Sequence, residues 1–188
     1  MTDQSSPIHS TRTETLALAC ANIDRLVRWA DDFPVAGVRF ADLTPVFADA
    51  DGLSTVIAAL AEAGEGVDLV AGIDARGFLL GAGVALALGT GVLAVRKAGK
   101  LPPPVVSQRY DLEYGSAEIE IPADIDVSGR KVLIVDDVLA TGGTIAATAE
   151  LLRARGAEVV GAAVALEISA LDGRSRCVGY PLVCLRQV

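Results

Sequence analysis

The hydrophobic positions in the first third of the chain follow a helical spacing and then give way to a loop. Residues 14–31 predict an amphipathic helix, because apolar side chains recur along one face at Leu16, Ala19, Ile23, Leu26 and Ala30. Residues 31–49 predict a loop, because Pro34, Gly37 and Pro45 interrupt them. A second helix is expected over residues 52–63, and the polar residues 1–13 are expected to be disordered.

Apolar residues dominate the middle of the chain. Residues 67–73 form a short apolar run of strand length, and no residue from 77 to 95 is charged. The second stretch approaches the length of a membrane-spanning helix. Glycines interrupt it, however, and Gly89 and Gly91 would break a helix near its end. The pattern therefore predicts a buried helix followed by a strand at residues 92–95, and no membrane association.

The segment that follows is basic and rich in proline. Residues 96–110 predict a long loop, because three consecutive prolines at 102–104 oppose both helix and central strand. Long loops inside compact domains are often functional. Strands of a hairpin are expected at residues 112–114 and 117–121, where glutamate and isoleucine alternate as in a half-exposed strand.

The last third alternates strand and helix. A strand is expected over residues 131–135, a helix over 144–155 and a strand over 159–166. Strands that alternate with helices, several of them fully apolar, predict an α/β fold with a mainly parallel sheet flanked by helices. The whole chain, residues 1–188, is expected to form a single domain. Ligands of such sheets bind beyond the carboxyl ends of the strands, so polar groups that follow strands should gather at one site.

Composition narrows the function. The formal net charge of −8 and a pI of about 4.6 disfavour nucleic-acid binding through the general field of the protein. Three cysteines, Cys20, Cys177 and Cys184, lack the CxxC spacing of a zinc site and predict no disulfide framework. Residues 1–14 lack the apolar core of a signal peptide, so a cytoplasmic location is expected.

Residues 131–144 have the layout of a phosphate site. They read K-V-L-I-V-D-D-V-L-A-T-G-G-T, an apolar strand, two acids and a glycine turn that opens a helix. Glycines let backbone N–H groups close on an anion, and the helix directs its positive end toward it. The acids could simply be hydrated at the end of the strand. We favour carboxylates of Asp136 or Asp137 that accept hydrogen bonds from ribose hydroxyls.

The turn itself has two interpretations. Residues Ala140, Thr141, Gly142, Gly143 and Thr144 could be a plain connection with Thr144 as the helix N-cap. Adjacent glycines cost backbone entropy, however, so a bound 5′-phosphate explains them better. The spacing matches neither the GxxxxGK[ST] phosphate loop nor GxGxxG. Residues 74–77, D-A-R-G, are weak alone, but beside the basic loop they suggest a second phosphate group held by Arg76.

These motifs together resemble those of the type I phosphoribosyltransferases, and most closely the purine enzymes that act on adenine. The pattern V-x-x-V-D-D-x-x-A-T-G-G-T at residues 132–144 marks the wider family. Four other stretches narrow the resemblance: F-P-V-A-G-V-R-F-A-D-L-T-P-V-F (33–47), A-G-I-D-A-R-G-F (71–78), V-R-K-A-G-K-L-P (95–102) and Y-D-L-E-Y-G-S-A-E-I-E-I (110–121). The match runs in order from about residue 14 to the end of the chain.

The resemblance implies a reaction and its cofactor. The phosphoribosyl group of 5-phosphoribosyl 1-diphosphate (PRPP) would pass to N9 of adenine, giving AMP and diphosphate in purine salvage. Mg²⁺ would be held mainly through PRPP, with no direct protein ligand, and the enzyme would be a homodimer. Asp136 and Asp137 would hold the ribose, and residues 140–144 the 5′-phosphate. The diphosphate would meet the loop of Asp74, Ala75 and Arg76, which in the family often contains a cis peptide bond not at proline. Three further cations, Arg96, Lys97 and Lys100, would help to neutralise it.

The resemblance also implies the base site and a mobile cover. Residues 97–116 would form a flexible hood that closes over PRPP, with Tyr114 in it and Glu113 as the catalytic carboxylate beside the base. The base-side loop, residues 33–49, would lie against adenine, whose contacts would be Val38, Arg39, Phe40, Ala41 and Ile168. Some relatives have arginine where this chain has Ala41, and glycine or a polar residue where it has Pro103.

Two alternatives use the same phosphoribosyl motif. One is a transferase for xanthine or another purine, which the L-E-Y-G stretch and the F-x-D-L-T-P loop disfavour. The other is a PRPP-sensing regulator of transcription. That class needs a DNA-binding segment, whereas only residues 1–13 precede the first expected helix and the chain is acidic.

Overall fold

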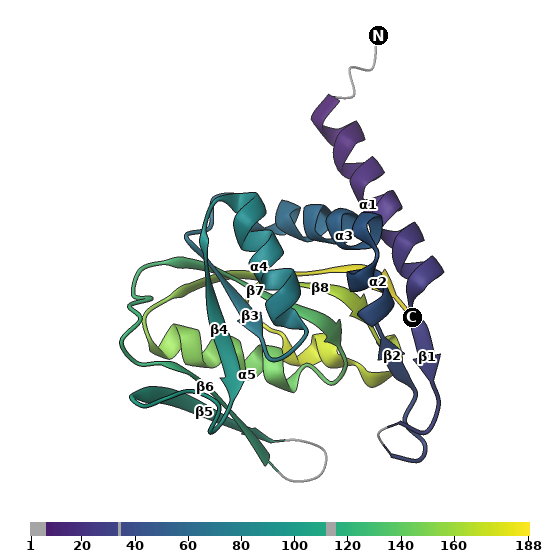
Figure 1. The fold of residues 1–188 in the computed structure, drawn as a ribbon. Helices are drawn as coiled ribbons and strands as arrows, with labels where there is room; N and C mark the ends of the chain where they lie inside the picture. Colours follow the sequence, from purple (N-terminus) through teal and green to yellow (C-terminus); the bar gives the residue numbers. More distant parts are fainter. Residues whose placement is uncertain (1–6, 34, 112–115) are drawn as a thin grey trace.

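The computed structural model describes residues 7–33, 35–111 and 116–188, and a seven-stranded sheet forms its centre (Figure 1). The strand order is β5-β6-β4-β3-β7-β8-β9. Five neighbours run parallel, namely β4 (Gly91–Lys97), β3 (Leu69–Ile73), β7 (Lys131–Leu139), β8 (Glu158–Glu167) and β9 (Leu182–Gln187). An antiparallel hairpin of β5 (Val105–Asp111) and β6 (Ser116–Pro122) continues the sheet beside β4. The predicted α/β fold with a mainly parallel sheet is confirmed.

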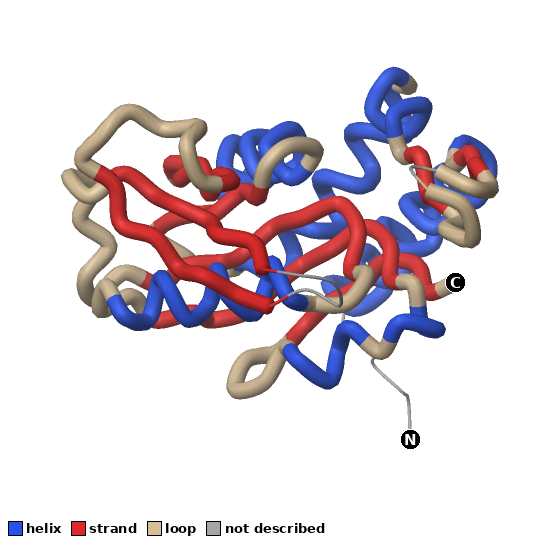
Figure 2. The backbone as a smooth tube through the Cα atoms, turned by 90° about the horizontal axis from the view of Figure 1, so that it is seen from below, coloured by secondary structure: helices blue, strands red, loops and turns tan. Residues whose placement is uncertain are grey.

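Helices cover both faces of the sheet, as Figures 1 and 2 show. On one face lie α1 (Pro7–Leu26), α3 (Ala50–Ala61) and α4 (Gly77–Leu88); on the other lies α5 (Gly143–Ala154), beside the β5–β6 hairpin. Alternate residues of the central strands serve the two cores. Leu133 packs in the core with α1, α3 and α4, and its neighbour Ile134 packs in the core with α5. Strand β3 and residues 132–135 of β7 are therefore apolar throughout.

Helix α4 approaches the sheet more closely than side chains would allow. A Cβ atom on Gly81 would lie 3.0 Å from the Cα atom of Gly72 in β3. A Cβ atom on Gly77 would lie 2.9 Å from the backbone oxygen of Val135 in β7. Gly77 and Gly81 are thus needed for this contact, and the predicted helix and strand are both present. Among the described residues, no helix is both long and apolar enough to cross a bilayer.

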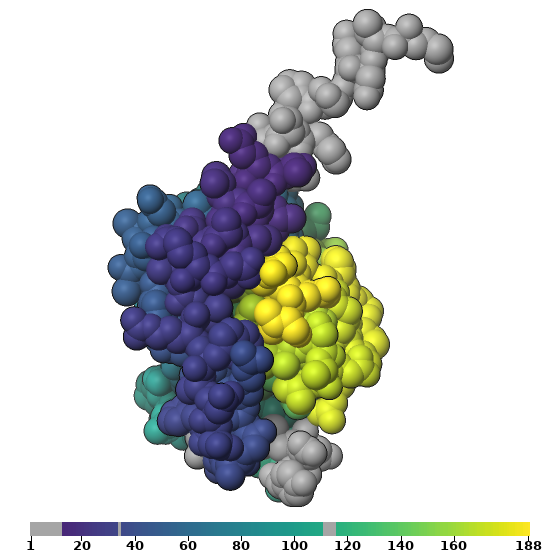
Figure 3. Space-filling model, turned by 90° about the vertical axis from the view of Figure 1, so that its right-hand side faces the viewer, coloured from purple at the N-terminus to yellow at the C-terminus, as the bar shows by residue number. Residues whose placement is uncertain are grey.

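The N-terminal third differs from the prediction, although its surface is continuous with the rest of the molecule (Figure 3). Helix α1 begins at Pro7, where disorder was expected as far as residue 13, and it ends at Leu26. Strands β1 (Arg28–Ala30) and β2 (Phe40–Asp42) then form a separate hairpin, and α2 (Thr44–Ala48) follows within the expected loop. Strands of three residues give too short a pattern to be recognised in a sequence. The hairpin fixes both ends of residues 31–39, which carry much of the base-side loop.

The basic proline-rich segment also differs from the prediction. Strand β4 extends through Arg96 and Lys97, and β5 begins at Val105, so only residues 98–104 connect them. The prolines lie in that connection, and β5 is an edge strand that needs a partner on one side only. The expected strand at residues 112–114 lies outside the described residues. Glu120 in β6 is only 4 % exposed, although the alternating pattern predicted a half-exposed strand.

Boundaries near the predicted phosphate site shift as well. Strand β7 continues to Leu139, so Asp136 and Asp137 belong to the strand. The N-cap of α5 is Gly142, and Thr144 lies inside the first turn of the helix. After β8 come two short 3₁₀ helices, Ser169–Leu171 and Gly173–Arg176, and then β9. A further 3₁₀ turn, Glu62–Gly64, follows α3. Neither the two turns after β8 nor the strand β9 was predicted.

We expect Gly81→Val to destabilise the fold through the contact between α4 and β3. The added side chain must push apart two backbone segments, and overpacking of this kind lowers the free energy of unfolding by about 1–3 kcal/mol. Leu86→Val in the same helix is the control, because Leu86 is 82 % exposed. It should change the free energy by less than about 0.5 kcal/mol. Urea denaturation of both variants measures the difference, and equal midpoints would contradict the close packing.

Candidate active site

The two acids of β7 lie at the carboxyl end of the sheet and serve different cavities. Asp136 lines a small hollow with the turn that follows β7, whereas Asp137 lines a larger cavity with the base-side loop. The Nε atom of Arg76 lies 2.7 Å from Oδ2 of Asp137, which is only 6 % exposed. That oxygen accepts no hydrogen bond from any residue the structure describes. The contact is thus an ion pair, and the paired oxygen of Asp137 is itself buried.

The local environment opposes full ionisation of both acids. Burial and the neighbouring carboxylate of Asp137 raise the pKa of Asp136 well above its usual value. Burial also raises the pKa of Asp137, against the opposing charge of Arg76. The backbone N–H of Asp137 donates to Oδ1 of Asp136 at 2.8 Å. Two carboxyl groups whose pKa values are raised in this way at the end of a strand are typical of a functional site.

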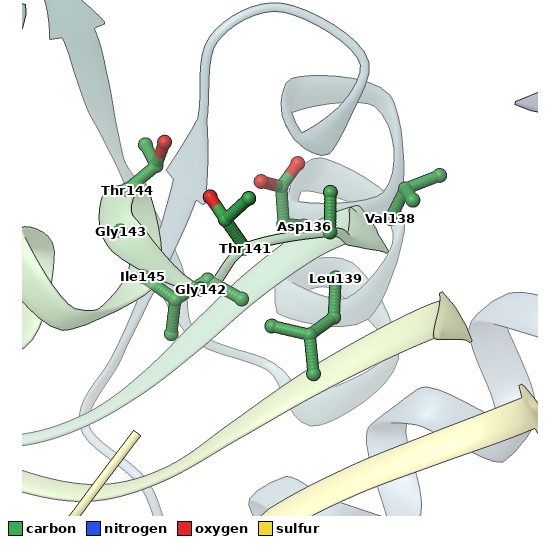
Figure 4. A pocket seen from close by; sticks show the side chains of 9 residues that line it. Asp136, Val138, Leu139, Thr141, Gly142, Gly143, Thr144 and Ile145 are labelled. Carbon is green, nitrogen blue, oxygen red and sulfur yellow. The ribbon is translucent and has the colours of Figure 1, made fainter. Parts of the chain in front are cut away.

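The turn after β7 surrounds a hollow of about 70 Å³. Its lining includes all five residues predicted to bind a phosphate: Ala140, Thr141, Gly142, Gly143 and Thr144. Figure 4 shows the hydroxyls of Thr141 and Thr144 on the same side as the carboxylate of Asp136, with Leu139 and Ile145 turned away. The hollow opens onto the first N–H groups of α5, which have no partner inside the helix. This combination of donors suits an anion.

Two residues that the sequence did not reveal support this turn. Gly142 has φ +75°, and a Cβ atom there would lie 2.1 Å from the backbone oxygen of Gly173. A Cβ atom on Gly173 would lie equally close to the backbone oxygen of Ala140. The hydroxyl of Tyr110, from β5, lies 3.1 Å from that of Thr144. A glycine after the last predicted strand was the only signal for Gly173. Tyr110 begins one of the stretches that carry the resemblance, but its segment was expected to be a loop and no contact with Thr144 was predicted.

The residues predicted to bind diphosphate form a second cluster. The peptide bond between Asp74 and Ala75 is cis, as the resemblance implied. Arg96 places its Nε atom 3.2 Å from Oδ2 of Asp74, and Arg76 donates through Nη1 to the backbone oxygen of Ala41 at 3.1 Å. The structure therefore joins Arg76 to the acids of β7 and Arg96 to the loop after β3. Lys97 and Lys100 are exposed at the same end of β4.

The predicted base site is a cavity of about 270 Å³. All five predicted residues line it, together with five others: Val38, Arg39, Phe40, Ala41 and Ile168, with Arg76, Asp137, Val138, Ala140 and Leu171. Val138 and Leu171 were missed, because Val138 reads as an ordinary apolar strand residue and no quoted motif reaches Leu171. The guanidinium of Arg39 lies 4.4 Å from the centre of the Trp29 ring. Ala41 is 3 % exposed and orients Arg76 through its carbonyl.

Two predicted residues cannot be placed in this geometry. Glu113, the predicted catalytic carboxylate, and Tyr114, the predicted hood residue, both lie outside the described residues. The strands on either side of them are described, and Asp111 pairs with Ser116 across the hairpin. The hairpin contacts α5, whose first residues form part of the phosphate turn.

Comparisons with known proteins agree with the geometry of the site. The model of the phosphoribosyl transferase domain matches residues 42–184. A protein of Nocardia farcinica named adenine phosphoribosyltransferase is 62 % identical over 173 residues, which are 92 % of this chain and 91 % of that protein. The crystal structure of adenine phosphoribosyltransferase from Thermoanaerobacter pseudethanolicus has a TM-score of 0.86 at 44 % identity, over 90 % of this chain and 99 % of that one.

A ligand-bound structure is also similar. Adenine phosphoribosyltransferase of Saccharomyces cerevisiae, crystallised with adenine and D-2,5-dideoxy-2,5-imino-altritol 1,6-bisphosphate, has a TM-score of 0.83. It is 36 % identical, and the match covers 90 % of this chain and 99 % of that chain. The matched region contains the two acids, the phosphate turn and the loop with the cis peptide. The chain therefore belongs to the phosphoribosyl transferase family, and within it to the adenine phosphoribosyltransferases.

Proposed function

We infer that this enzyme transfers the phosphoribosyl group of PRPP to N9 of adenine and releases AMP and diphosphate. The observation that carries this inference is the junction of two cavities at β7. A small polar hollow suited to a phosphate adjoins a larger cavity lined mostly by apolar residues, and adjacent acids of one strand line the two. A phosphoribosyl group held between them presents its C1 atom toward the larger cavity, where a planar base fits.

We propose that the turn of residues 140–144 binds the 5′-phosphate and that the acids of β7 hold the ribose hydroxyls. The orientation of the hydroxyls of Thr141 and Thr144 supports the first role (Figure 4). The positions of Asp136 on the phosphate hollow and of Asp137 on the adjoining cavity support the second. As the bond to diphosphate breaks, positive charge develops on the ribose. Carboxylates beside the ring stabilise that charge electrostatically.

We propose that the loop after β3 and the cations beside it receive the diphosphate. Arg76 and Arg96 each have donors that the ion pairs with Asp137 and Asp74 leave in place. A guanidinium presents a planar set of donors to phosphate oxygens. Asp74 and Ala75 would contribute the loop itself, with Lys97 and Lys100 as exposed charges nearby. Diphosphate leaves as a highly charged anion, so cations at this position favour its departure.

Adenine is proposed to occupy the cavity between the base-side loop and β8. Phe40 and Ile168 provide apolar surface on its wall, and Val38, Ala41 and the backbone of Arg39 complete that side. The side chain of Arg39 is 66 % exposed and pairs with Asp31, so contacts through its backbone agree better with the geometry. The small side chain at position 41 leaves room for the guanidinium of Arg76 against the Ala41 carbonyl.

The proton chemistry is assigned to Glu113 as a proposal from the family resemblance. Adenine must lose the proton of N9 as the new bond forms, and a carboxylate within reach can accept it. The hood, residues 97–116 with Tyr114, would exclude water from the site. Support comes from the hairpin of β5 and β6, which brackets these residues and lies beside the phosphate turn.

Mg²⁺ is the proposed cofactor, and the donors present fit it as a companion of the substrate. Among the described residues no group of three or more His, Cys, Asp or Glu side chains gathers as a metal site. Mg²⁺ is usually bound through substrate phosphates and keeps several waters, so PRPP itself would hold the ion, while Asp136 and Asp137 would hold the ribose. When bound, the ion would neutralise charge on the diphosphate. A homodimer and a cytoplasmic location are proposed from the family resemblance alone.

The substrate assignment is tested by turnover of four purine bases with PRPP and Mg²⁺. We expect AMP to form from adenine with a kcat/KM at least about 100-fold above that for hypoxanthine, guanine or xanthine, because a mismatched hydrogen-bonding edge leaves buried polar groups unpaired. Chromatography of the nucleotide products measures the rates. A purified enzyme that forms no AMP, or that prefers an oxo-purine, would overturn the assignment.

Asp136→Asn should make the protein more stable and less active. Because the pKa of Asp136 is raised in the folded state, wild type loses stability as pH rises from about 4 through that raised pKa. The amide of the variant has no charge to bury, so at higher pH the variant should be more stable than wild type by about 1 kcal/mol or more. Loss of a hydrogen bond to a charged group should lower kcat/KM for PRPP by roughly 10- to 100-fold. Thermal melts at pH 4 and pH 8 provide the measurement; a variant less stable than wild type at pH 8 would contradict the assignment of strain to this carboxyl.

Tyr110→Phe should raise the KM for PRPP without changing the KM for adenine. The hydroxyls of Tyr110 and Thr144 lie 3.1 Å apart and either can donate; when the tyrosine donates, the threonine proton is free for the 5′-phosphate. Loss of one such hydrogen bond should raise the KM for PRPP by about 3- to 10-fold. The control is a double-mutant cycle with Thr144→Val. In the Thr144→Val background the tyrosine substitution should have no further effect, and additive effects would show that Tyr110 acts elsewhere.

A further inference from the structure

Glu120 is a buried carboxylate that the proposed chemistry does not use. It lies in β6 between Ile119 and Ile121, and all three are almost fully buried. The antiparallel register places it opposite Arg96 of β4 and opposite Ser107 of β5. Buried carboxylates are costly unless hydrogen bonds compensate for lost hydration. The partners of Glu120 therefore indicate why this position is acidic.

The partners are backbone groups of the connection between β4 and β5. The Oε1 atom of Glu120 accepts the N–H of Lys100 at 2.8 Å and the N–H of Leu101 at 2.7 Å. Burial alone would raise the pKa of Glu120, but these donated hydrogen bonds and the charge of Arg96 hold that pKa below its usual value. The carboxylate is thus ionised and fixes two consecutive amides of a segment that otherwise contains three prolines.

The same segment is held from its other side by Arg96. Nη1 of Arg96 donates to the backbone oxygen of Lys100 at 2.9 Å, while Nε lies 3.2 Å from Oδ2 of Asp74. Glu120 and Arg96 together hold the backbone around Lys100, and Arg96 continues the connection to the loop with the cis peptide. A line of direct contacts therefore runs from Glu120 in β6 to Asp74 after β3.

We propose that Glu120 is a positioning residue for the diphosphate site: through the amides of Lys100 and Leu101 it fixes Arg96 and Lys100 for the diphosphate group of PRPP. This inference rests on the proposed assignment of the diphosphate to these cations. The residue touches no substrate and moves no proton. Its effect is to hold donors in place before the anion arrives, which lowers the entropic cost of binding.

A simple charge effect predicts the opposite result, and this makes the proposal testable. Removal of a carboxylate near Arg96 leaves more net positive charge, which by itself would strengthen binding of an anion. Loss of positioning instead weakens it. AMP has the ribose, base and 5′-phosphate but no diphosphate, so its binding reports the rest of the site.

The experiment compares Glu120→Gln with Glu118→Gln. Glu118 lies two residues earlier in β6, is exposed and binds the hydroxyl of Ser107 across the hairpin, so it is a matched control. In Glu120→Gln we expect the KM for PRPP and the Kd of diphosphate, from calorimetry with Mg²⁺, to rise about 5- to 20-fold, because a neutral acceptor replaces a charged one at two amides. The Kd of AMP and the KM for adenine should stay within about twofold of wild type, as a positioning effect confined to one subsite requires. Glu118→Gln should match wild type throughout.

Three results would overturn the proposal: tighter diphosphate binding, equal losses for diphosphate and AMP, or the same losses in Glu118→Gln. Glu120→Asp is the second variant, because it keeps the charge but has a shorter side chain that can reach one amide at best. It should weaken diphosphate binding relative to wild type, and less than Glu120→Gln does, again without loss of AMP binding. If Glu120→Gln does not fold, the comparison of Glu120→Asp with wild type decides the question alone. Formation of AMP by wild type is measured in parallel, so failure of this inference is distinguishable from failure of the proposed function.

Discussion

Burial of β3 and β7 on both faces is the constraint on which the rest of the structure depends. A strand packed between two helical layers cannot carry a polar side chain along its length without leaving that side chain unpaired. The polar side chains that bind ligands are therefore found at the carboxyl ends of the strands. In this chain β3, β4, β7 and β8 run parallel, so their ends meet at one edge. Asp74, Arg96 and Asp136 all lie in this region for the same reason, and Ile168 follows the end of β8 beside them.

The close contact of α4 with the sheet adds a second level to this constraint. Because Gly77 and Gly81 allow the helix to lie against the backbone of β3 and β7, the turn before α4 is carried toward Asp136 and Asp137. Arg76 is the last residue before the helix and reaches Asp137 from there. A wider separation between helix and strand would move that guanidinium away from the acids. Packing far inside the core thus decides the electrostatics of the site.

Much of the site could be predicted from sequence because its motifs are local. The acids and the glycine turn of residues 136–144 occupy one continuous stretch, and their chemistry follows from residue type and order. The base-side residues came from the family resemblance, and the cavities group them as expected. Arg76 was indicated by its own position beside the basic loop, and the resemblance then assigned the loop around it to diphosphate. Gly173, Leu171 and Tyr110 escaped prediction because each depends on a contact between segments distant in sequence. Glu120 was predicted incorrectly for a similar reason: alternation shows that two faces differ but not that a loop folds back over one of them.

The facing glycines at 142 and 173 have a consequence for how this site can change. Each occupies space that a side chain on the other would need, since Gly142 meets the oxygen of Gly173 and Gly173 meets the oxygen of Ala140. The turn after β7 and the turn after β8 are therefore a single mechanical unit, although the whole of α5 and β8 separates them in the chain. Grafting the phosphate turn alone onto another α/β scaffold would transfer half of that unit. A transplant that preserves its shape must bring the segment around Gly173 with it, and with that segment comes Leu171 on the wall of the base cavity. The segments that recognise the sugar phosphate and the base therefore have to be transferred together.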